Sequence, residues 1–473
     1  MSILSGLDTA QRALYSQQLG LEIAQRNVAN ANTPGYTKLR LSFEPATTNG
    51  ADSAQAGAGI AGVTIDSFRN NFVDYRLNQE LQGQGEQQAA SDALQQVEAL
   101  FSDQGGLSLQ GALSNFFNSF ATLANTPEDI SQRQQVLAAA EKLTGQFHRL
   151  YDQIQAIQSQ QNRVVPDTVE EINSVTSQIA RLNKQMVGLT NGHSVEESAA
   201  RDERQQLLDH LSGLVDISYY EDSLGLVTVQ TKQGALLVAG TQSKTLETGP
   251  SPVTGFQNIF QDGVDITSRI QSGKLAGLIK VRDVTIPAYL NSLDDMAAAL
   301  ITSVNDQHKI GFALNGDQGG DFFTPFVPPA LGSNAGAARS FSVAIADHPT
   351  LIAAAGPSAG DPNLAAGPGS NANAQLLAGI KDDPLPTLGE TPDQYYSNVI
   401  FQIGSDSQSA YDGLQTQNNI VQQLLNQRDT FSGVSLDEEA VNIIKYQKAY
   451  QASARFVTVL DTLSDEILRI LGG

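Results

Sequence analysis

Residues 1–36 read MSILSGLDTAQRALYSQQLGLEIAQRNVANANTPGY, and this stretch decides the fold expected for the whole chain. Four large apolar residues recur every seven positions: Leu7, Leu14, Leu21 and Val28. Such a repeat is typical of a helix that packs in a coiled coil. Pro34 disfavours a helical conformation at the residue before it, and Gly35 supplies the positive φ of a tight turn. The first helix is therefore expected to end just before the turn Asn32-Thr33-Pro34-Gly35-Tyr36.

The other end of the chain carries a matching pattern. Seven residues share the apolar face of a predicted C-terminal helix: Leu436, Ile443, Tyr446, Tyr450, Val457, Leu460 and Ile467. We expect the two terminal helices to pair as a coiled coil. The pairing could close one domain, or the two helices could hold neighbouring subunits, and the two interpretations are compatible.

Between the ends, the apolar spacing changes several times. Alternation predicts strands after the turn, at residues 38–43 and 63–68, and a hairpin within 215–250. Spacings of three and four predict helices over 71–125, 131–186, 286–306 and from residue 391 onward. Pro166 should either divide the longest of these into two helices or kink it. A short strand is expected at 341–345, among loops rich in glycine and proline.

These elements define a mainly α fold with a smaller β part and nested, discontinuous domains. The predicted terminal coiled-coil assembly domain joins 1–45 to 430–473. A domain of long helices, packed as a bundle, takes 46–215 with 270–315 and 390–429. A small β-rich outer insertion takes 216–269 and 316–389.

Composition excludes several classes of function. The 473 residues include no cysteine, so disulfide scaffolds and zinc-thiolate sites are excluded. A net charge of −22 disfavours binding to nucleic acid, and 6% aromatic residues with no tryptophan argue against a stacking platform. No run approaches 18 apolar residues, so no membrane insertion is expected. The termini are nearly neutral, which suits dense packing between subunits.

Four motifs have residue types found in binding or catalytic sites, and none of them is expected to form such a site. Gly57 to Gly62 satisfies G-x-G-x-x-G, but a strand is expected to follow it where a nucleotide site needs a helix. The polar loop at 315–321 lacks the bidentate glutamate of a calcium loop. The five histidines have no metal-ligand spacing. Asp437-Glu438-Glu439 follows Ser435 at a predicted helix start, where acidic groups stabilise the helix dipole. No catalytic residue, cofactor or metal site is expected, and the chain is not expected to be an enzyme.

Both terminal patterns resemble signatures of one protein family. Residues 31–36 (ANTPGY), directly after a heptad helix, are similar to the N-terminal signature of bacterial flagellar rod, hook and hook-associated proteins. Residues 432–439 (SGVSLDEE) and 446–455 (YQKAYQASAR) are similar to the C-terminal signature of the same group. The long helices at 85–186, the segment 273–314 and the residues after Asp347-His348-Pro349 resemble its hook-associated members. The resemblance covers most of the chain, more loosely at 190–270 and 355–390.

The resemblance implies a non-enzymatic structural component of the flagellum. Such a protein is exported without cleavage through the flagellar type III apparatus and lies outside the cell, at the junction between hook and filament. It would self-associate in a ring and contact the hook protein and a second junction protein, and an export chaperone would bind its C-terminal helix. The heptad residues would form the assembly interface, and residues 32–36 the family's turn.

Three alternatives remain open at the level of sequence. The chain could be a hook or distal-rod subunit, which should be shorter or richer in β structure after the turn. It could be a secreted scaffold that carries an enzymatic or adhesive insertion at 200–390. It could also be an intracellular coiled-coil scaffold, although that function leaves the Asn-Thr-Pro-Gly-Tyr turn unexplained.

Overall fold

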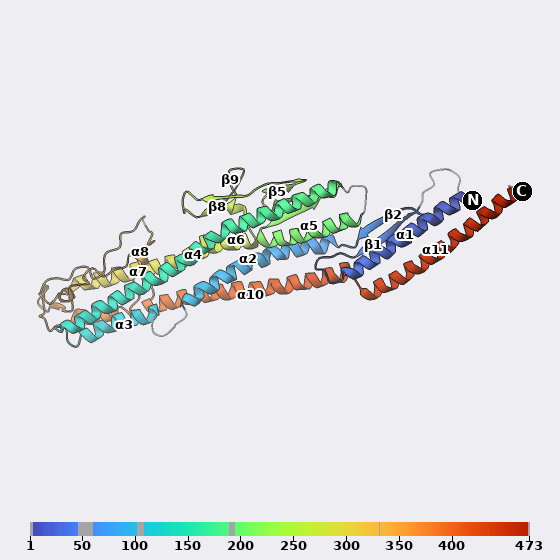
Figure 1. Ribbon diagram of the computed structural model, residues 1–473. Coiled ribbons are helices and arrows are strands. Elements are labelled where there is room, and N and C mark those ends of the chain that lie inside the picture. The colour runs from blue at the N-terminus through green and yellow to red at the C-terminus, as the bar shows by residue number, and fades with distance from the viewer. Residues whose placement is uncertain (1–2, 46–59, 102–107, 189–193, 331, 472–473) are drawn as a thin grey trace. The chain divides into compact units, whose positions relative to one another are not determined.

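The computed structural model describes residues 3–45, 60–101, 108–188, 194–330 and 332–471, and within them the fold is mainly helical (Figure 1). Long helices dominate the element order: α1 (Ile3–Ala29), α2 (Asn71–Phe101), α3 (Leu109–Leu123), α4 (Ile130–Val187), α5 (Val195–Leu214), α7 (Ile286–Ile310), α10 (Pro392–Ser432) and α11 (Leu436–Leu471). The expectation of a mainly α fold with long helices and a smaller β part is confirmed.

The chain forms two compact units, each built from separated segments. Unit 1 contains Met1–Glu86, Thr168–Leu275 and Gln415–Gly473, and unit 2 contains Gln87–Asp167 and Ala276–Leu414. Nested, discontinuous organisation is thus present. The three-part division expected from the sequence stays a prediction, and residues 216–269 and 316–389 fall in different units.

Unit 1 joins both ends of the chain to most of the β structure. Strands β1 (Leu39–Pro45) and β2 (Ile60–Ser67) form an antiparallel hairpin in which Leu41 pairs with Ile65. A four-stranded sheet has the order β3-β4-β5-β6, from Ile217–Glu221, Val227–Thr231, Leu236–Ala239 and Gln242–Ser243. A second sheet consists of β7 (Glu247–Pro250), β8 (Gln257–Gln261) and β9 (Val264–Asp265). The predicted hairpin within 215–250 is confirmed by the antiparallel pair β4 and β5.

Buried polar side chains attach the four-stranded sheet to α4 and α5. Asn183 donates to the carbonyl oxygens of Val227 and Gly240, both at 2.7 Å, and accepts from Arg204 at 3.1 Å. Arg204 also donates to the Gly225 carbonyl at 2.7 Å. Because such groups are costly to bury without partners, each amide and guanidinium is satisfied by the turns that it holds.

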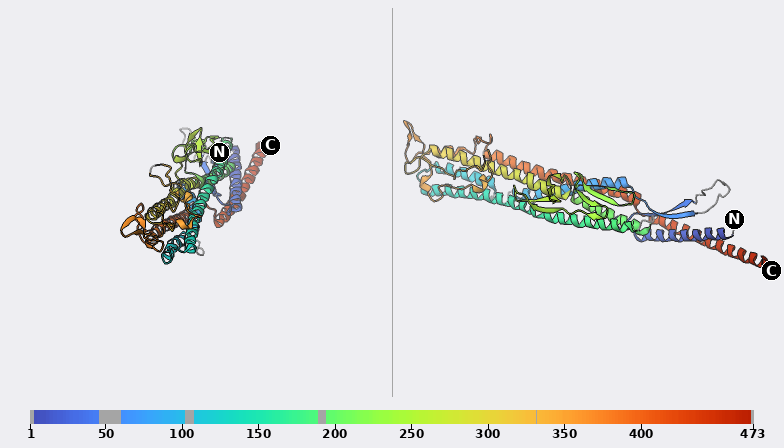
Figure 2. Two further views of the ribbon diagram at one scale, coloured as in Figure 1. Left: turned by 90° about the vertical axis from the view of Figure 1, so that its left-hand side faces the viewer. Right: turned by 90° about the horizontal axis from the view of Figure 1, so that it is seen from above.

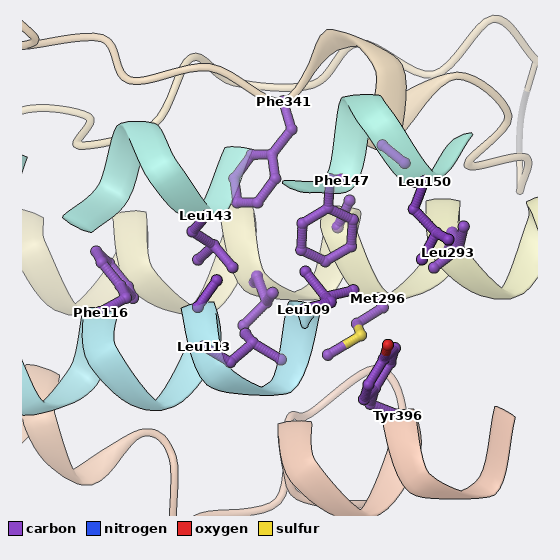
Figure 3. Close-up of a cluster of buried hydrophobic side chains, with 14 of the residues drawn as sticks. Leu109, Leu113, Phe116, Leu143, Phe147, Leu150, Leu293, Met296, Phe341 and Tyr396 are labelled. Carbon is purple, nitrogen blue, oxygen red and sulfur yellow. The ribbon is translucent and has the colours of Figure 1, made fainter. Parts of the chain in front are cut away.

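Unit 2 is a helical bundle around one apolar core. Its parts of α4 and α10 pack with α3 and α7, and Figure 3 shows Leu113, Phe147, Met296 and Tyr396 converging from four helices. Phe147 meets Phe341 with ring centroids 5.2 Å apart. The four-and-three apolar spacing of α4 explains its burial, because those positions share one helical face.

Short elements connect unit 1 to α7 and complete unit 2 after α7. A 3-10 turn (Thr267–Arg269) in unit 1 precedes α6 (Gly273–Lys280), and a π-helical turn (Val281–Thr285) joins α6 to α7. Beyond α7, the chain forms α8 (Ala337–Ser340), a 3-10 turn (Pro349–Leu351), β10 (Pro357–Ser358), β11 (Asp361–Ala365) and α9 (Ala372–Gly379). The prediction of a strand at 341–345 is wrong. Val343 makes only an isolated bridge to Phe323, because Phe341 and Ile345 serve as core side chains of a loop.

Pro166 does not divide the long helix, contrary to one of the two expectations. α4 continues unbroken from Ile130 to Val187 with Pro166 inside it. A proline within a helix costs about 3 kcal/mol. Val165 is fully buried and Val169 is 3% exposed, and each buried side chain of this size contributes roughly 1.5–3 kcal/mol. Burial on both sides of the proline is therefore large enough to keep the helix continuous.

The glycine-rich motif at 57–62 falls largely on residues outside the described ranges. Gly57 and Gly59 belong to that part, while Gly62 lies in β2. The segment Ile60–Ser67 is a strand, as expected, so the helix that a nucleotide site needs does not follow the motif.

Candidate assembly interface

The terminal helices α1 and α11 lie side by side and run antiparallel (Figures 1 and 2). Gly6 of α1 faces Leu460 of α11, and Gly20 faces Tyr446, so the two contacts are fourteen residues apart on each helix. Ala10 and Ala24 of α1 are 3% and 1% exposed. Small residues on α1 thus let the larger side chains of α11 approach its backbone.

The structure brings two of the predicted residues of α11, Tyr446 and Leu460, into this contact, whereas the predicted heptad residues of α1 lie beside it. Leu7 and Val28 are 40% and 39% exposed, and Leu14 and Leu21 are half-buried. On α11, four of the predicted residues are half-buried: Ile443, Tyr446, Val457 and Leu460. Leu436 and Tyr450 are 54% and 43% exposed, and the side chain of Ile467 lies outside the described part. Their role in contacts between subunits stays a prediction.

A second apolar face of α11 was missed in the sequence. It consists of five residues whose side chains are 49–64% exposed: Val441, Ile444, Phe456, Val459 and Leu463. Their spacings of three, twelve, three and four residues place them on one side of the helix, with Lys448 and Ala452 in the gap. We call these five residues the α11 stripe. The spacing of these five residues could have predicted this face, but the heptad repeat on the other side of the helix is the stronger pattern.

The predicted turn after α1 is held by a buried asparagine. Asn27, fully buried in the last turns of α1, accepts from the Tyr36 hydroxyl at 2.8 Å and from the Leu39 N–H at 3.1 Å. Its amide group donates to the Leu39 carbonyl at 3.0 Å. Burial, with the nearby Asp202 carboxylate, raises the pKa of Tyr36 to about 12. Tyr36 therefore stays a hydrogen-bond donor that joins the helix to the strand.

The turn residues before Tyr36 lie against α5. Gly35 has φ of +76°, and a Cβ atom there would lie 2.5 Å from Nε2 of Gln206. Gln206 donates to the Pro34 carbonyl at 2.8 Å. Asn32, Thr33 and Pro34 are exposed. The positive φ is thus the reason for glycine at this position, because the end of the Gln206 side chain could move away from a Cβ atom.

A polar cluster beside the turn connects it to α2 and α5. Asp202 accepts from the Thr37 N–H at 3.0 Å and from Arg69 at 2.5 Å. Arg69 also lies 3.7 Å from Asp74. Burial is the main cause of the raised pKa of Asp74, and Arg69 opposes that rise. This network pairs residues far apart in sequence, so no local spacing could predict it.

The start of α11 is attached to β1 by charge. The Lys38 ammonium pairs with Glu438 and lies 3.7 Å from the buried Glu439, and the Lys38 N–H donates to the Ser432 carbonyl at 2.8 Å. The hydrogen bond from Lys38 lowers the pKa of Glu438. Asp437, Glu438 and Glu439 all lie in the first turn of α11, as expected, and acidic groups at this position stabilise the helix dipole.

A groove of about 890 Å³ lies between β1 and the first turns of α11. Three half-exposed phenylalanines line it: Phe43, Phe68 and Phe431, at 44%, 52% and 45% exposure. Aromatic residues are enriched in protein interfaces. The groove and the α11 stripe share Val441, so the two surfaces meet at the start of α11.

Two features of the described residues concern metal ions and membranes. Among them, no group of three or more His, Asp or Glu side chains could hold a metal ion. Within the same ranges, no helix is long and apolar enough to span a membrane. His308 is buried, and His210 pairs with Glu171 at 3.0 Å.

Three family models match consecutive parts of the chain. Residues 7–37 match the model described as flagella basal body rod protein, and 415–470 match flagellar basal body rod FlgEFG protein C-terminal. Residues 94–323 match flagellar hook-associated protein FlgK helical domain. The first model covers most of α1 and the turn after it, the second covers the end of α10 and nearly all of α11, and the third begins in α2.

Curated relatives match along nearly the whole chain. Flagellar hook-associated protein 1 of Bacillus subtilis is 29% identical over 511 residues, covering 100% of this chain and 99% of that protein. The Salmonella typhimurium and Escherichia coli proteins of the same name are 24% and 23% identical, each covering at least 98% of both chains.

The fold also matches a solved structure. The flagellar hook junction protein FlgK from Burkholderia pseudomallei superimposes with a TM-score of 0.67 at 18% identity, covering 76% of this chain and 100% of that one. At this identity, the similarity shows a shared fold.

Proposed function

This chain belongs to the family of flagellar hook-associated proteins, and from that premise we propose that it assembles as a ring between hook and filament. It is a structural component of the bacterial flagellum and lies outside the cell. Its function is to pack against neighbouring subunits, with no reaction turned over. The terminal segments 1–45 and 430–473 would act as the assembly part, as expected from the sequence.

The observation that carries this proposal is the apolar surface left on the terminal helices after they pair. The α11 stripe exposes five large apolar side chains, and Leu7 and Val28 remain partly exposed on α1. Exposed apolar residues scattered singly are ordinary, whereas an aligned row marks an interaction surface. A second copy of the chain is the proposed occupant.

Different faces on α1 and α11 suit a ring. When one subunit offers its α11 stripe to the α1 face of the next, the contact is heterologous, and repetition by rotation closes a ring. The turn Asn32 to Tyr36 supports this arrangement indirectly, because its contacts fix where α1 ends relative to β1.

We propose three further partners from the family. The hook protein would lie on one side of the ring and the second junction protein on the other, so the ring would adapt one geometry to the other. An export chaperone would cover the C-terminal helix before secretion. Five exposed apolar residues along α11 are a surface that such a chaperone would shield.

Gene deletion tests the proposal directly. Cells that lack the gene are examined by electron microscopy, and the medium is assayed for flagellin. Intact hooks without filaments, with flagellin shed into the medium, are expected, and plasmid-borne wild-type protein should restore filaments. Absent hooks would instead favour a rod or hook subunit, and normal filaments would overturn the junction function.

A further inference from the structure

His308 connects the end of α7 to two loops of unit 2. Its side chain is fully buried, with Nδ1 2.7 Å from the Gly320 carbonyl oxygen and Nε2 2.9 Å from the Ala353 backbone nitrogen. A carbonyl oxygen can only accept and a backbone N–H can only donate. His308 must therefore be neutral, with its hydrogen on Nδ1 and a lone pair on Nε2.

The two loops bear core side chains. Gly320 precedes Phe322 and Phe323 by two and three residues, and both phenylalanines are fully buried. The Phe322 ring packs against the His308 ring with centroids 5.4 Å apart. His308 thus holds the point where this loop enters the apolar core.

Neighbouring polar side chains support the same loops without titrating. Asn305 accepts from the N–H groups of Phe322 and Phe323 at 2.9 and 2.8 Å. Asn373 donates to the Ala353 carbonyl at 2.7 Å. Among these three supports, only His308 can change charge near neutral or mildly acidic pH.

The charges near His308 come from two other elements. Arg133 of α4, 1% exposed, donates to the Ile352 carbonyl at 2.6 Å, and its positive charge disfavours a second one nearby. Asp321 favours the charged imidazole, but it pairs with Lys309 at 2.5 Å. Burial dominates and lowers the pKa of His308 to about 4.

We propose that His308 is an acid-sensitive latch, in which protonation of Nε2 breaks its bond to Ala353 and loosens the hold of α7 on the loop that contains Ala353, while Asn305 still holds the loop of Phe322 and Phe323. The added proton would place two N–H groups face to face and bury a charge beside Arg133. The helices of unit 2 keep their own hydrogen bonds, so the change is confined to the loops. A folded-state pKa below the unfolded value of about 6.5 means that His308 stabilises the fold fully above that pH, and the stabilisation is lost as pH falls toward 4.

Hydrogen exchange on the full chain tests the latch. Exchange rates are corrected for their intrinsic pH dependence and compared between pH 7 and 4.5. Protection at the amides of Phe312, Ala353 and Ala355 is expected to fall at least about tenfold, with the amides within α3 unchanged. Retained loop protection at pH 4.5 would overturn the proposal.

A matched pair of variants separates the latch from general acid effects. His308→Gln keeps one donor and one acceptor on a side chain that does not titrate, and His210→Gln removes an exposed histidine from unit 1. Loop protection should survive acid in His308→Gln and be lost in His210→Gln. If His308→Gln lost protection as the wild type does, the latch would be wrong. If that variant failed to fold, titration of the wild-type imidazole by NMR decides: loss of loop protection following a pKa near 4 supports the latch, and titration near 6.5 with loops intact rules it out.

Discussion

Tyr446 of α11 lies against Gly20 of α1 so closely that a Cβ atom at Gly20 would come within 2.7 Å of the ring. Near the other end of the pair, a Cβ at Gly6 would lie 3.5 Å from Leu460, which is ordinary contact. The two glycines occupy equivalent positions on α1, fourteen residues apart, yet only one of them leaves no space for a methyl group.

Gly20→Ala is expected to loosen the α1–α11 pair, and Gly6→Ala is its matched control. Both changes gain about 0.5–1 kcal/mol because alanine favours a helix over glycine. At Gly20, overpacking against Tyr446 should cost about 1–3 kcal/mol and outweigh that gain. Hydrogen exchange across residues 6–28 of the full chain measures this: amide protection should fall in Gly20→Ala relative to the wild type and should not fall in Gly6→Ala.

The double variant Gly20→Ala/Tyr446→Ala checks the cause of this effect. Without the aromatic ring of Tyr446, the methyl group added at residue 20 should no longer destabilise the α1–α11 pair relative to Tyr446→Ala alone. A persistent effect would place the steric conflict elsewhere.

The buried asparagine at the turn should matter more than the tyrosine that contacts it. Asn27→Ala leaves the Leu39 N–H and carbonyl without their partner, at about 1–3 kcal/mol for each buried group left unpaired. Tyr36→Phe removes a single hydrogen bond worth about 0.5–1.5 kcal/mol. Urea unfolding of the full chain, monitored by tyrosine fluorescence, should give a lower free energy of unfolding for Asn27→Ala than for Tyr36→Phe. Equal losses would mean that Asn27 acts only through Tyr36.

Much of this architecture could be predicted from local patterns. The spacing of Leu143, Phe147, Leu150 and Ile154 predicts a buried helical face, and all four are buried in α4. The turn at Pro34 and Gly35 follows from their restricted and permissive φ values. Local pattern and three-dimensional structure agree wherever the neighbouring residues alone decide the conformation.

The rest depends on contacts that the sequence cannot display. Pro166 stays within α4, where Val165 and Val169 on either side of it are buried, and the spacing of residues around a proline does not show that burial. Gly20 meets Tyr446, and a search for large apolar repeats passes over small residues of this kind. Asp202 and Thr37 are 165 residues apart and meet only in the folded unit.

Asp216 should make stability fall as pH rises. It lies between α5 and β3, fully buried, and the desolvation of its carboxyl group outweighs the backbone hydrogen bonds of Gln271 and Lys232, which act in the opposite direction. Burial raises its pKa to about 6 from 3.8. The folded state therefore binds the proton more tightly than the unfolded state, so the contribution of Asp216 is most favourable below about pH 4 and is lost as pH rises through 6.

Asp216→Asn should remove this dependence. The variant is expected to melt at a higher temperature than the wild type at pH 7.5 and at nearly the same temperature at pH 4. The control Asp222→Asn alters an exposed carboxylate that accepts hydrogen bonds from the Leu224 and Leu226 N–H groups in the turn before β4. Its effect on the melting temperature should not increase between pH 4 and pH 7.5 as that of Asp216→Asn does. Equal melting shifts at both pH values would contradict the assignment to Asp216.

The α11 stripe should be needed for assembly while the monomer tolerates its loss. Val459 is 53% exposed, so Val459→Asp should change monomer stability by no more than about 0.5 kcal/mol. In the proposed ring, the same change would bury an unpaired carboxylate, which costs several kcal/mol. Swimming in soft agar and filament number by electron microscopy should both drop sharply.

Thr458→Asp provides the matched control, because Thr458 is exposed and adjacent but lies off the stripe. It should leave motility close to the wild type. Leu21→Asp and Val457→Asp, at predicted interface positions that are half-buried, should abolish assembly with unit 2 still folded by circular dichroism and hydrogen exchange. If Val459→Asp swam normally while Leu21→Asp did not, the ring contact would involve α1 without the stripe. The occupant of the exposed face of α11 would then be something other than a second copy.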